Sequence, residues 1–256
     1  MINQETKKLK KIFLILGIGR EKRNWSRPIE VLQAALPEFE IIALDNPGMG
    51  EYNKMKVPRT INKNIVFLKE NFDKLKGNEN YFVGWSLGGM IVAKWSQLYP
   101  KDMNGMVLIT SSFGSLQAPW LRLRVMIIPK VLTAILSKGR KREDMMFSSI
   151  CRNENNRERL VNEWIQIQND RPVSALNIIH QLEAATIFFT GSFKKQHPAL
   201  VLGAAKDQLV NNKCSKNIKA FWNTEYQEHP TAGHDVFNDD PEWITAQVKD
   251  WLTEIK

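Results

Sequence analysis

Short apolar runs alternate along this chain with longer segments whose apolar residues recur at helical spacing. The runs with the length and composition of buried strands lie at residues 11–17, 41–44, 81–84, 105–110 and 199–203, with a shorter one near residues 225–227. The segments with helical periodicity lie at residues 28–36, 60–75, 91–98, 213–222 and 241–252. This alternation predicts an α/β protein with a mostly parallel central sheet and helices on both of its faces.

The alternation of strand and helix patterns stops between residues 112 and 185. This segment is helical in pattern, is rich in Met, Leu, Trp and Arg, and contains no obvious strand. We therefore expect a core made of residues 1–111 and 186–256, with residues 112–185 inserted between two of its strands as a helical segment. The sequence contains no internal repeat, low-complexity stretch or interdomain linker.

Composition agrees with one α/β domain. The 256 residues are 43% hydrophobic and 25% charged, and no apolar run has the length of a membrane span. Lysines before the apolar run at residues 12–16 imitate a signal peptide, but the run is short and no small-residue cleavage site follows. We expect a polar tail that enters a buried strand. Two cysteines, Cys151 and Cys214, form neither a disulfide framework nor a metal-ligand spacing, so a reduced cytoplasmic location is expected.

The formal charge of +9 is concentrated in one part of the chain. Between Trp120 and Leu160, ten Lys and Arg residues stand against four Asp and Glu residues. Nucleic acid is the first partner to consider for a basic protein, but the sequence contains no recognised nucleic-acid motif, so none is expected. No residue pattern indicates a metal ion or an organic cofactor.

A serine stands between the predicted strand at residues 81–84 and the predicted helix at residues 91–98. It belongs to the stretch Gly84-Trp85-Ser86-Leu87-Gly88, which has the Gly-x-Ser-x-Gly pattern of a nucleophile elbow. Small residues two positions to either side let the strand and the helix approach closely, with the serine held at positive φ. A glycine-rich turn can carry such a triplet by chance, so the prediction of a nucleophile depends on its partners downstream.

A serine nucleophile needs a histidine as base and an acid that orients the histidine. In elbow-type enzymes these follow the serine in the order acid, then histidine. His234 lies in a glycine-led loop after the last predicted strand, whereas His180 falls inside the helical insertion and His197 and His229 each precede a proline. Asp207 follows the strand at residues 199–203 and is favoured over Asp144 and Asp235 because its loop opens at the same sheet edge. The predicted triad is Ser86, Asp207 and His234.

An oxyanion formed at this serine needs two N–H donors. The backbone of Leu87, immediately after the nucleophile, is expected to supply one. The loop after the first core strand is expected to supply the other, from the backbone of Ile18, because Gly17 and Gly19 allow that loop to turn inward.

Together these residues resemble the α/β-hydrolase superfamily over nearly the whole chain. The matching stretches are Leu16-Gly17-Ile18-Gly19, Asp45-Asn46-Pro47-Gly48-Met49-Gly50, Gly84-Trp85-Ser86-Leu87-Gly88-Gly89, Gly203-Ala204-Ala205-Lys206-Asp207 and Gly233-His234. Within the superfamily, the elbow and the following Leu108-Ile109-Thr110-Ser111-Ser112 are similar to carboxylesterases that act on pimeloyl-carrier-protein methyl ester in biotin synthesis. That family usually has His-Gly in the oxyanion loop, where this chain has Leu16-Gly17, so the hydrogen bonds that support the loop must differ.

The resemblance implies that the insertion is a helical lid over an acyl pocket and that Trp85 forms a wall of this pocket. It also gives the basic charge a use, because similar esterases dock an acidic acyl carrier protein through lid arginines. The residues expected to contact substrate or carrier are Trp85, Arg122, Arg124, Arg140, Arg142, Arg157 and Arg159. A solvated basic helix face explains the same arginines equally well.

The leading hypothesis is a serine carboxylic-ester hydrolase that works through an acyl-enzyme, acting on a small-molecule or carrier-bound ester. A second hypothesis keeps the triad for thioester hydrolysis, C–C bond hydrolysis or lyase chemistry of the menaquinone-pathway kind. C–C bond or lyase chemistry calls for a pocket that binds a carboxylate or an enolate. A third is a non-catalytic basic interaction module on a vestigial hydrolase fold, which predicts a broken triad.

Overall fold

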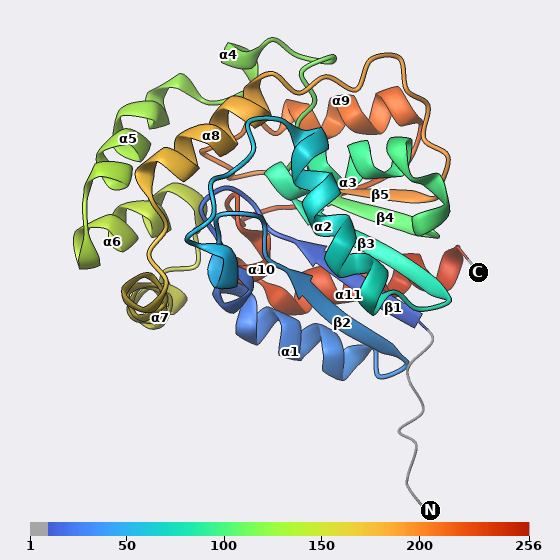
Figure 1. Ribbon diagram of the computed structural model, residues 1–256, viewed down its shortest axis with the longest axis horizontal. Coiled ribbons are helices and arrows are strands. Elements are labelled where there is room, and N and C mark those ends of the chain that lie inside the picture. Colours follow the sequence, from blue (N-terminus) through green and yellow to red (C-terminus); the bar gives the residue numbers. More distant parts are fainter. Residues whose placement is uncertain (1–9, 256) are drawn as a thin grey trace, which may run out of the picture.

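A six-stranded sheet forms the centre of the computed structural model, which describes residues 10–255 (Figure 1). Its strands are β1 (Lys10–Ile15), β2 (Phe39–Leu44), β3 (Glu79–Trp85), β4 (Gly105–Ile109), β5 (Ala199–Ala204) and β6 (Glu225–His229). They lie in the order β2-β1-β3-β4-β5-β6, and every neighbouring pair is parallel. The predicted parallel sheet is confirmed. The predicted polar tail at residues 1–9 lies outside the described part of the chain.

Helices cover both faces of the sheet, as the alternating pattern predicted (Figure 1). Along β1, Ile12 and Leu14 pack into the apolar cluster with α1 (Ser26–Ala35) and α11 (Pro241–Glu254). Side chains in a strand alternate between faces, so Phe13 and Ile15 pack into the opposite cluster. That cluster contains α2 (Ile61–Leu75), α3 (Leu87–Leu98) and α9 (Lys213–Trp222).

The register of the strands brings their carboxyl ends to one edge of the sheet. Ile15 pairs with Gly84, Trp85 pairs with Ile109, and Ile109 pairs with Leu202. The loops that carry the predicted oxyanion, nucleophile and acid residues follow β1, β3 and β5, and the loop of the predicted base follows β6. Because all four loops leave the same edge, residues far apart in sequence can meet there.

Five helices lie between β4 and β5: α4 (Pro119–Arg122), α5 (Ile128–Leu136), α6 (Gly139–Ile150), α7 (Arg157–Asp170) and α8 (Ala175–Thr186). We call them the inserted helices. In Figure 1 they form the group that runs from green to orange beside the sheet, with α4 at the top of the view and α5 and α6 at its left edge. The remaining short helices are α10 (Val236–Asp239) and the 3-10 turns η1 (Lys22–Trp25), η2 (Gly50–Tyr52), η3 (Pro100–Asp102), η4 (Val125–Ile127) and η5 (Glu154–Asn156). Within residues 10–255, no helix is both long and apolar enough to cross a membrane.

Candidate active site

Ser86 sits at the apex of the sharp turn between β3 and α3, with φ 55° and ψ −114°. The neighbouring glycines make this turn possible. A Cβ at Gly88 would lie 1.9 Å from the carbonyl oxygen of Ile15, and one at Gly84 would lie 2.5 Å from that of Gly88. The Ser86 N–H donates to Ile109 at 2.9 Å, so the strained residue is fixed to the end of β4. The strand, turn and helix therefore have the form that the elbow pattern predicts.

Asp207 and His234 meet at the same edge, although 27 residues separate them. His234 Nδ1 lies 2.8 Å from Asp207 Oδ2, and the two residues are only 1% and 2% exposed. The other carboxylate oxygen, Oδ1, accepts the backbone N–H groups of Leu209 at 2.8 Å and Val210 at 2.9 Å. A carboxylate held from both sides in this way fixes the imidazole with its other nitrogen, Nε2, free for proton transfer.

Residues of the central strands hold the backbone of His234. Its carbonyl oxygen accepts from Trp85 Nε1 at 2.8 Å and from Thr110 Oγ1 at 2.9 Å. Its Nε2 is buried and has no hydrogen-bond partner among the described residues. Trp85 is thus more than the predicted pocket wall, because it also positions the histidine loop.

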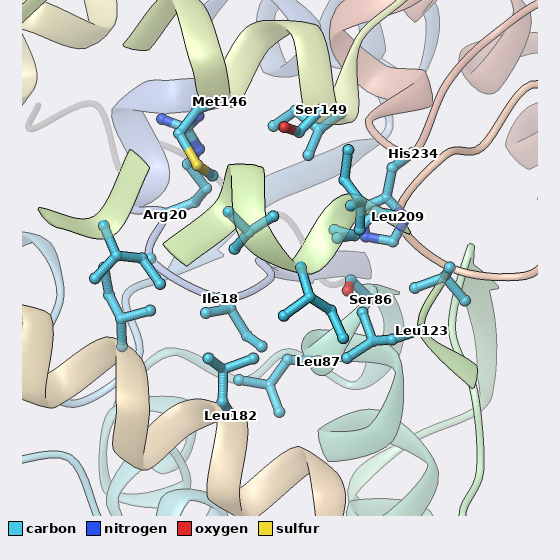
Figure 2. A pocket seen from close by; sticks show the side chains of 18 of the residues that line it. Ile18, Arg20, Ser86, Leu87, Leu123, Met146, Ser149, Leu182, Leu209 and His234 are labelled. Carbon is cyan, nitrogen blue, oxygen red and sulfur yellow. The ribbon is translucent and has the colours of Figure 1, made fainter. Parts of the chain in front are cut away.

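Ser86 and His234 line a cavity of about 340 Å³ between the sheet edge and the inserted helices (Figure 2). Side chains around these two residues are mainly apolar and come from both parts of the molecule; those labelled in Figure 2 include Ile18, Leu87, Leu123, Leu182 and Leu209. A cavity of this size and polarity suits an acyl chain that ends at the serine.

The loop predicted to carry the second oxyanion donor is supported by residues that the sequence did not indicate. Asn46 Nδ2 donates to the carbonyl oxygen of Leu16 at 3.1 Å. The N–H of Gly19 donates at 2.8 Å to Oε1 of Gln181, which is 162 residues away on α8. Within the described chain, the backbone N–H groups of Ile18 and Leu87 donate no hydrogen bond. The loop is therefore held in place while the N–H groups of Ile18 and Leu87 remain available as donors. These contacts support the loop although Leu16 stands where the similar carboxylesterases usually have histidine.

A buried ionic cluster lies at another part of the cavity wall. Arg20 Nη1 is 3.2 Å from Glu143 Oε2, and Arg142 Nε is 3.3 Å from Glu143 Oε1. The Arg20 guanidinium also stacks on Trp164, 3.9 Å from the ring centroid, while its Nε and Nη2 have no hydrogen-bond partner among the described residues. Burial lowers the pKa of Arg142, with Glu143 opposing this effect. Two cations share one anion, so this part of the wall favours an anionic ligand group.

Of the predicted contact arginines, Arg122 is buried and Arg142 is half-buried. Arg122 Nη2 donates to the carbonyl oxygen of Ala185 at 2.9 Å and Nε donates to Ser112 Oγ at 3.1 Å. Arg122 therefore holds the C-terminal end of α8, where carbonyl groups favour a cation, and burial lowers its pKa. Arg142 belongs to the buried cluster. Both arginines line the cavity, and neither forms a docking surface.

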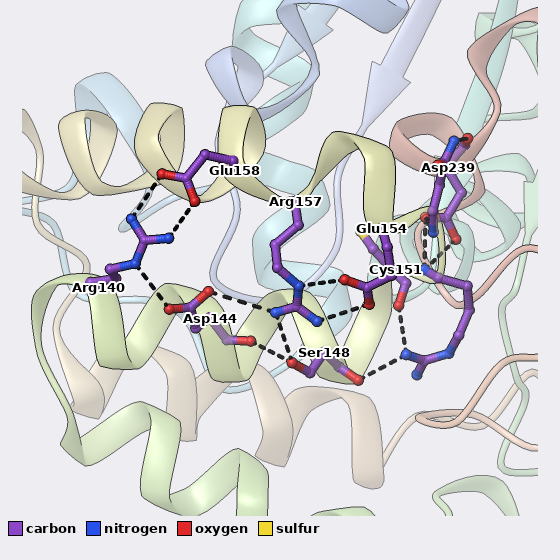
Figure 3. Close-up of polar contacts among 10 residues, drawn as sticks. Arg140, Asp144, Ser148, Cys151, Glu154, Arg157, Glu158 and Asp239 are labelled. Atoms are coloured by element: carbon purple, nitrogen blue, oxygen red, sulfur yellow. Dashed lines mark hydrogen bonds and ion pairs between the residues drawn. The ribbon is translucent and has the colours of Figure 1, made fainter.

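Three further arginines are on the surface but in ion pairs, and Figure 3 shows two of them, Arg140 and Arg157. Arg140 contacts both Asp144 and Glu158, Arg157 contacts Glu154 and Asp144, and Arg159 contacts Glu163. Arg124 is exposed and forms no ion pair with a described residue. Arg140, Arg157 and Arg159 are therefore not free arginines, because each is paired with an acid on α6, α7 or η5.

No group of three or more His, Cys, Asp or Glu side chains between residues 10 and 255 could hold a metal ion. The described histidines outside the pair with Asp207 have other surroundings. His180 is buried within α8, and His229 Nε2 lies 3.1 Å from Asp240 Oδ2. His234 is the histidine that shares a cavity with Ser86.

Comparison with known proteins gives matches over most of the chain. A family model described as alpha/beta hydrolase fold matches residues 12–241. A provisionally named 2-succinyl-6-hydroxy-2,4-cyclohexadiene-1-carboxylate synthase of Bacillus subtilis (strain 168) is 22% identical over 262 residues, 93% of this chain and 89% of that one. The pimeloyl-(acyl-carrier protein) methyl ester esterase of Wigglesworthia glossinidia brevipalpis is 27% identical over 108 residues, 40% of this chain and 36% of that one. The crystal structure of a provisionally named non-heme bromoperoxidase from Mycobacterium tuberculosis H37Rv has a TM-score of 0.77, with 20% identity, over 96% of this chain and 93% of that one.

Proposed function

The chain belongs to the α/β-hydrolase fold family, and from this premise we propose that it is a serine carboxylic-ester hydrolase working through an acyl-enzyme. One observation carries the proposal. The buried pair of Asp207 and His234 leaves Nε2 of the imidazole without a partner, in the cavity that Ser86 also lines. A nucleophile, a base and an orienting acid are the groups that this chemistry requires.

In this mechanism Ser86 Oγ attacks the ester carbonyl while His234 Nε2 accepts the hydroxyl proton. Asp207 stabilises the imidazolium that forms. The tetrahedral intermediate collapses when the C–O bond to the leaving alcohol breaks and His234 returns the proton to that oxygen. Water then attacks the acyl-enzyme with His234 as base, and the carboxylic acid leaves Ser86 free.

The negative charge of the intermediate would be held by the backbone N–H groups of Ile18 and Leu87. Leu87 begins α3, so the helix N-terminus adds its positive dipole end to the same place. Each such donor typically contributes about 3 kcal/mol to the stability of the transition state. The support of the loop by Asn46 and Gln181 favours this role for Ile18, because preorganised donors need no rearrangement during the reaction.

A narrower candidate substrate is the methyl ester of an acyl chain bound to a carrier protein, as in biotin synthesis. It is supported by the name of the Wigglesworthia relative, which matches 40% of this chain, and by the apolar cavity. In this candidate the inserted helices act as the lid, and exposed Arg124 is the best placed of the predicted arginines to meet an acidic carrier. Arg140, Arg157 and Arg159 give little support to docking of a carrier protein, because each already forms an ion pair within the chain.

A second candidate function is C–C bond cleavage or elimination on an anionic substrate with the same triad. The observation in its favour is the cationic cluster of Arg20 and Arg142 around Glu143 in the cavity wall. The name of the Bacillus relative points to chemistry of this kind. A non-catalytic interaction module is disfavoured, because such a protein has no need for a buried and oriented His234.

The test is hydrolysis of p-nitrophenyl esters from acetate to laurate by the wild type and by Ser86→Ala, together with labelling by a fluorophosphonate. We expect turnover and labelling of the wild type only, with a chain-length optimum set by the cavity. A folded wild type that neither turns over any ester nor accepts the probe would rule out the serine nucleophile.

Substrates of matched length separate the narrower candidates. A free methyl ester and the same ester on an acyl carrier protein test the carrier. A dicarboxylic acid monomethyl ester and its neutral analogue test the cationic cluster, with Arg142→Met as the variant. A preference for the anionic ester that is lost in Arg142→Met would show that the cluster binds an anionic group. This result would favour an anionic substrate, either for ester hydrolysis or for C–C bond cleavage.

A further inference from the structure

The outer side of the inserted segment at residues 119–142 exposes large apolar side chains. Met126 is 89% exposed, Leu136 is 81% exposed and Trp120 is 70% exposed. We call the following residues the apolar face: Trp120, Leu121, Val125, Met126, Leu132 and Leu136. Exposed Ile128 lies in the same segment, whereas other exposed large hydrophobic residues, such as Val66 and Leu98, lie on separate elements. A concentration of this kind indicates a surface that something apolar covers.

The charge around the apolar face has one sign. Residues 119–142 contain seven Lys and Arg residues and no Asp or Glu. Among them Arg124, Lys130, Lys138 and Lys141 form no ion pair with any residue that the structure describes. Arg140 and Arg157, by contrast, are already neutralised by acids on α6, α7 and η5. The free cations therefore accompany the exposed apolar residues.

The apolar face continues into the catalytic cavity. Ile128 and Leu132 of α5 are exposed, and both also line the cavity beside Ser86. The opposite side of α5 is apolar, with Ala134 buried and Ile135 at the cavity. The outward side of α5 is mixed, because polar Lys130 and Thr133 lie on this helix together with the exposed Leu132 and Leu136. The inward side of α5 meets apolar surroundings in the folded chain, whereas Leu132 and Leu136 stay exposed to solvent.

An anionic lipid surface fits these features better than a protein does. Trp, Met and Leu side chains with flanking Lys and Arg residues are typical of segments that lie in a membrane interface. A second copy of this chain would bring Lys138 and Lys141 close to like charges on an isologous partner. An acidic protein would satisfy the cations but would leave Met126 and Leu136 against a polar surface.

We propose that the apolar face docks onto an anionic lipid surface, with Trp120, Met126 and Leu136 inserted among the acyl chains and Lys138 and Lys141 against the headgroups. An apolar substrate could then pass from the lipid along Ile128 and Leu132 into the cavity without crossing water. Docking itself does not depend on ester hydrolysis, so it can be tested with the inactive Ser86→Ala protein.

The experiment is sedimentation of the full chain with vesicles of pure phosphatidylcholine or of phosphatidylcholine mixed with phosphatidylglycerol. We expect binding to the mixed vesicles, weakened by salt, and a blue shift of tryptophan fluorescence that Trp120→Phe reduces. The double variant Met126→Asp, Leu136→Asp should lose about tenfold or more in vesicle binding. Lys138→Glu should lose at least about fivefold, since each cation near an anionic surface contributes about that factor.

Matched controls lie on α2, on a different part of the molecule, where Val66 and Lys74 are also exposed. Val66→Asp and Lys74→Glu should leave vesicle binding unchanged. Hydrolysis of soluble p-nitrophenyl acetate by Met126→Asp in the wild-type background should also stay unchanged, because Met126 does not line the cavity.

Three results would overturn the proposal. The first is equal binding of the wild type to neutral and anionic vesicles, or none. The second is self-association that Met126→Asp abolishes, which would make a second copy the occupant. The third is saturable binding of an acidic acyl carrier protein that Lys138→Glu and Met126→Asp weaken while vesicle binding is absent.

Discussion

The sheet edge that carries the proposed triad and the surface of the inserted helices use charge in opposite ways. At the edge, Asp207 and His234 are buried, and each is held by hydrogen bonds from backbone or neighbouring strands. On the inserted helices, Arg140 pairs with Glu158 and Arg159 pairs with Glu163 in contact with solvent. Solvent screens the second kind of pair and hardly reaches the first. Substitutions at the edge should therefore have large effects on activity or stability, and substitutions that break the exposed ion pairs should have small ones.

The strongest test of this difference compares two serines. Ser86→Ala should lower kcat/KM for p-nitrophenyl butyrate about 10⁴-fold or more, because the nucleophile is removed. Ser137→Ala, at the end of α5, removes a hydroxyl that bonds only to the Thr133 carbonyl and should leave kcat/KM unchanged. Activity in Ser86→Ala close to that of the wild type would contradict the site.

A pair of glycines tests how the backbone forms the two regions. In Gly88→Ala the new Cβ would lie 1.9 Å from the Ile15 carbonyl oxygen, so we expect a loss of more than about 4 kcal/mol in unfolding free energy. Gly139 begins α6 at φ 55°, and nothing lies within 4 Å of the place that an added Cβ would take, so Gly139→Ala should cost only about 1 kcal/mol. Urea unfolding measures both. Equal losses of unfolding free energy in the two variants would mean that the elbow has room for a side chain at residue 88.

Two glutamates compare a buried ion pair with an exposed one. Glu143→Gln leaves buried Arg20 and half-buried Arg142 without their anion, and the expected loss is about 3 kcal/mol in unfolding free energy. Glu163→Gln breaks the exposed pair with Arg159 and should cost about 0.3 kcal/mol. Thermal unfolding at matched pH distinguishes them. A small loss in Glu143→Gln would show that the cluster is solvated.

The pH dependence of stability should reveal Asp235, which is next to His234. Burial raises the pKa of Asp235 from 3.8 to about 6, with Asn238 opposing the effect. The folded chain therefore binds this proton more tightly than the unfolded chain, so stability falls as pH rises from about 4 to about 6. The decrease should approach 3 kcal/mol, since one pKa unit corresponds to about 1.4 kcal/mol. Asp235→Asn should remove this decrease when the unfolding free energy is measured in urea at several pH values. An unchanged pH profile would mean that another group causes the decrease.

Features that depend on local sterics were predictable from the sequence. The elbow at Ser86 is set by glycines two residues away, and alternation along β1 sorts its side chains between two faces. Asp207 and His234 could be placed because parallel strands end at one edge.

Features that depend on contacts between distant residues were not predictable. Gln181 supports Gly19 across 162 positions, and Glu143 meets Arg20 across 123. A surplus of arginines could be counted, but the count does not tell which of them pair with acids on a neighbouring helix and which are buried. The inserted helices are therefore where the sequence was least informative.

The contacts that join the loop after β1 to the inserted helices have a consequence for the timing of a catalytic cycle. Movement of α8 away from the sheet would take Gln181 from Gly19, and movement of α6 would take Glu143 from Arg20. A substrate that enters by parting these helices would arrive while the loop around Ile18 is unsupported. Substrate entry and reaction would then be successive steps. Bulk water would reach an acyl-enzyme only after the loop that carries the Ile18 N–H had lost its support.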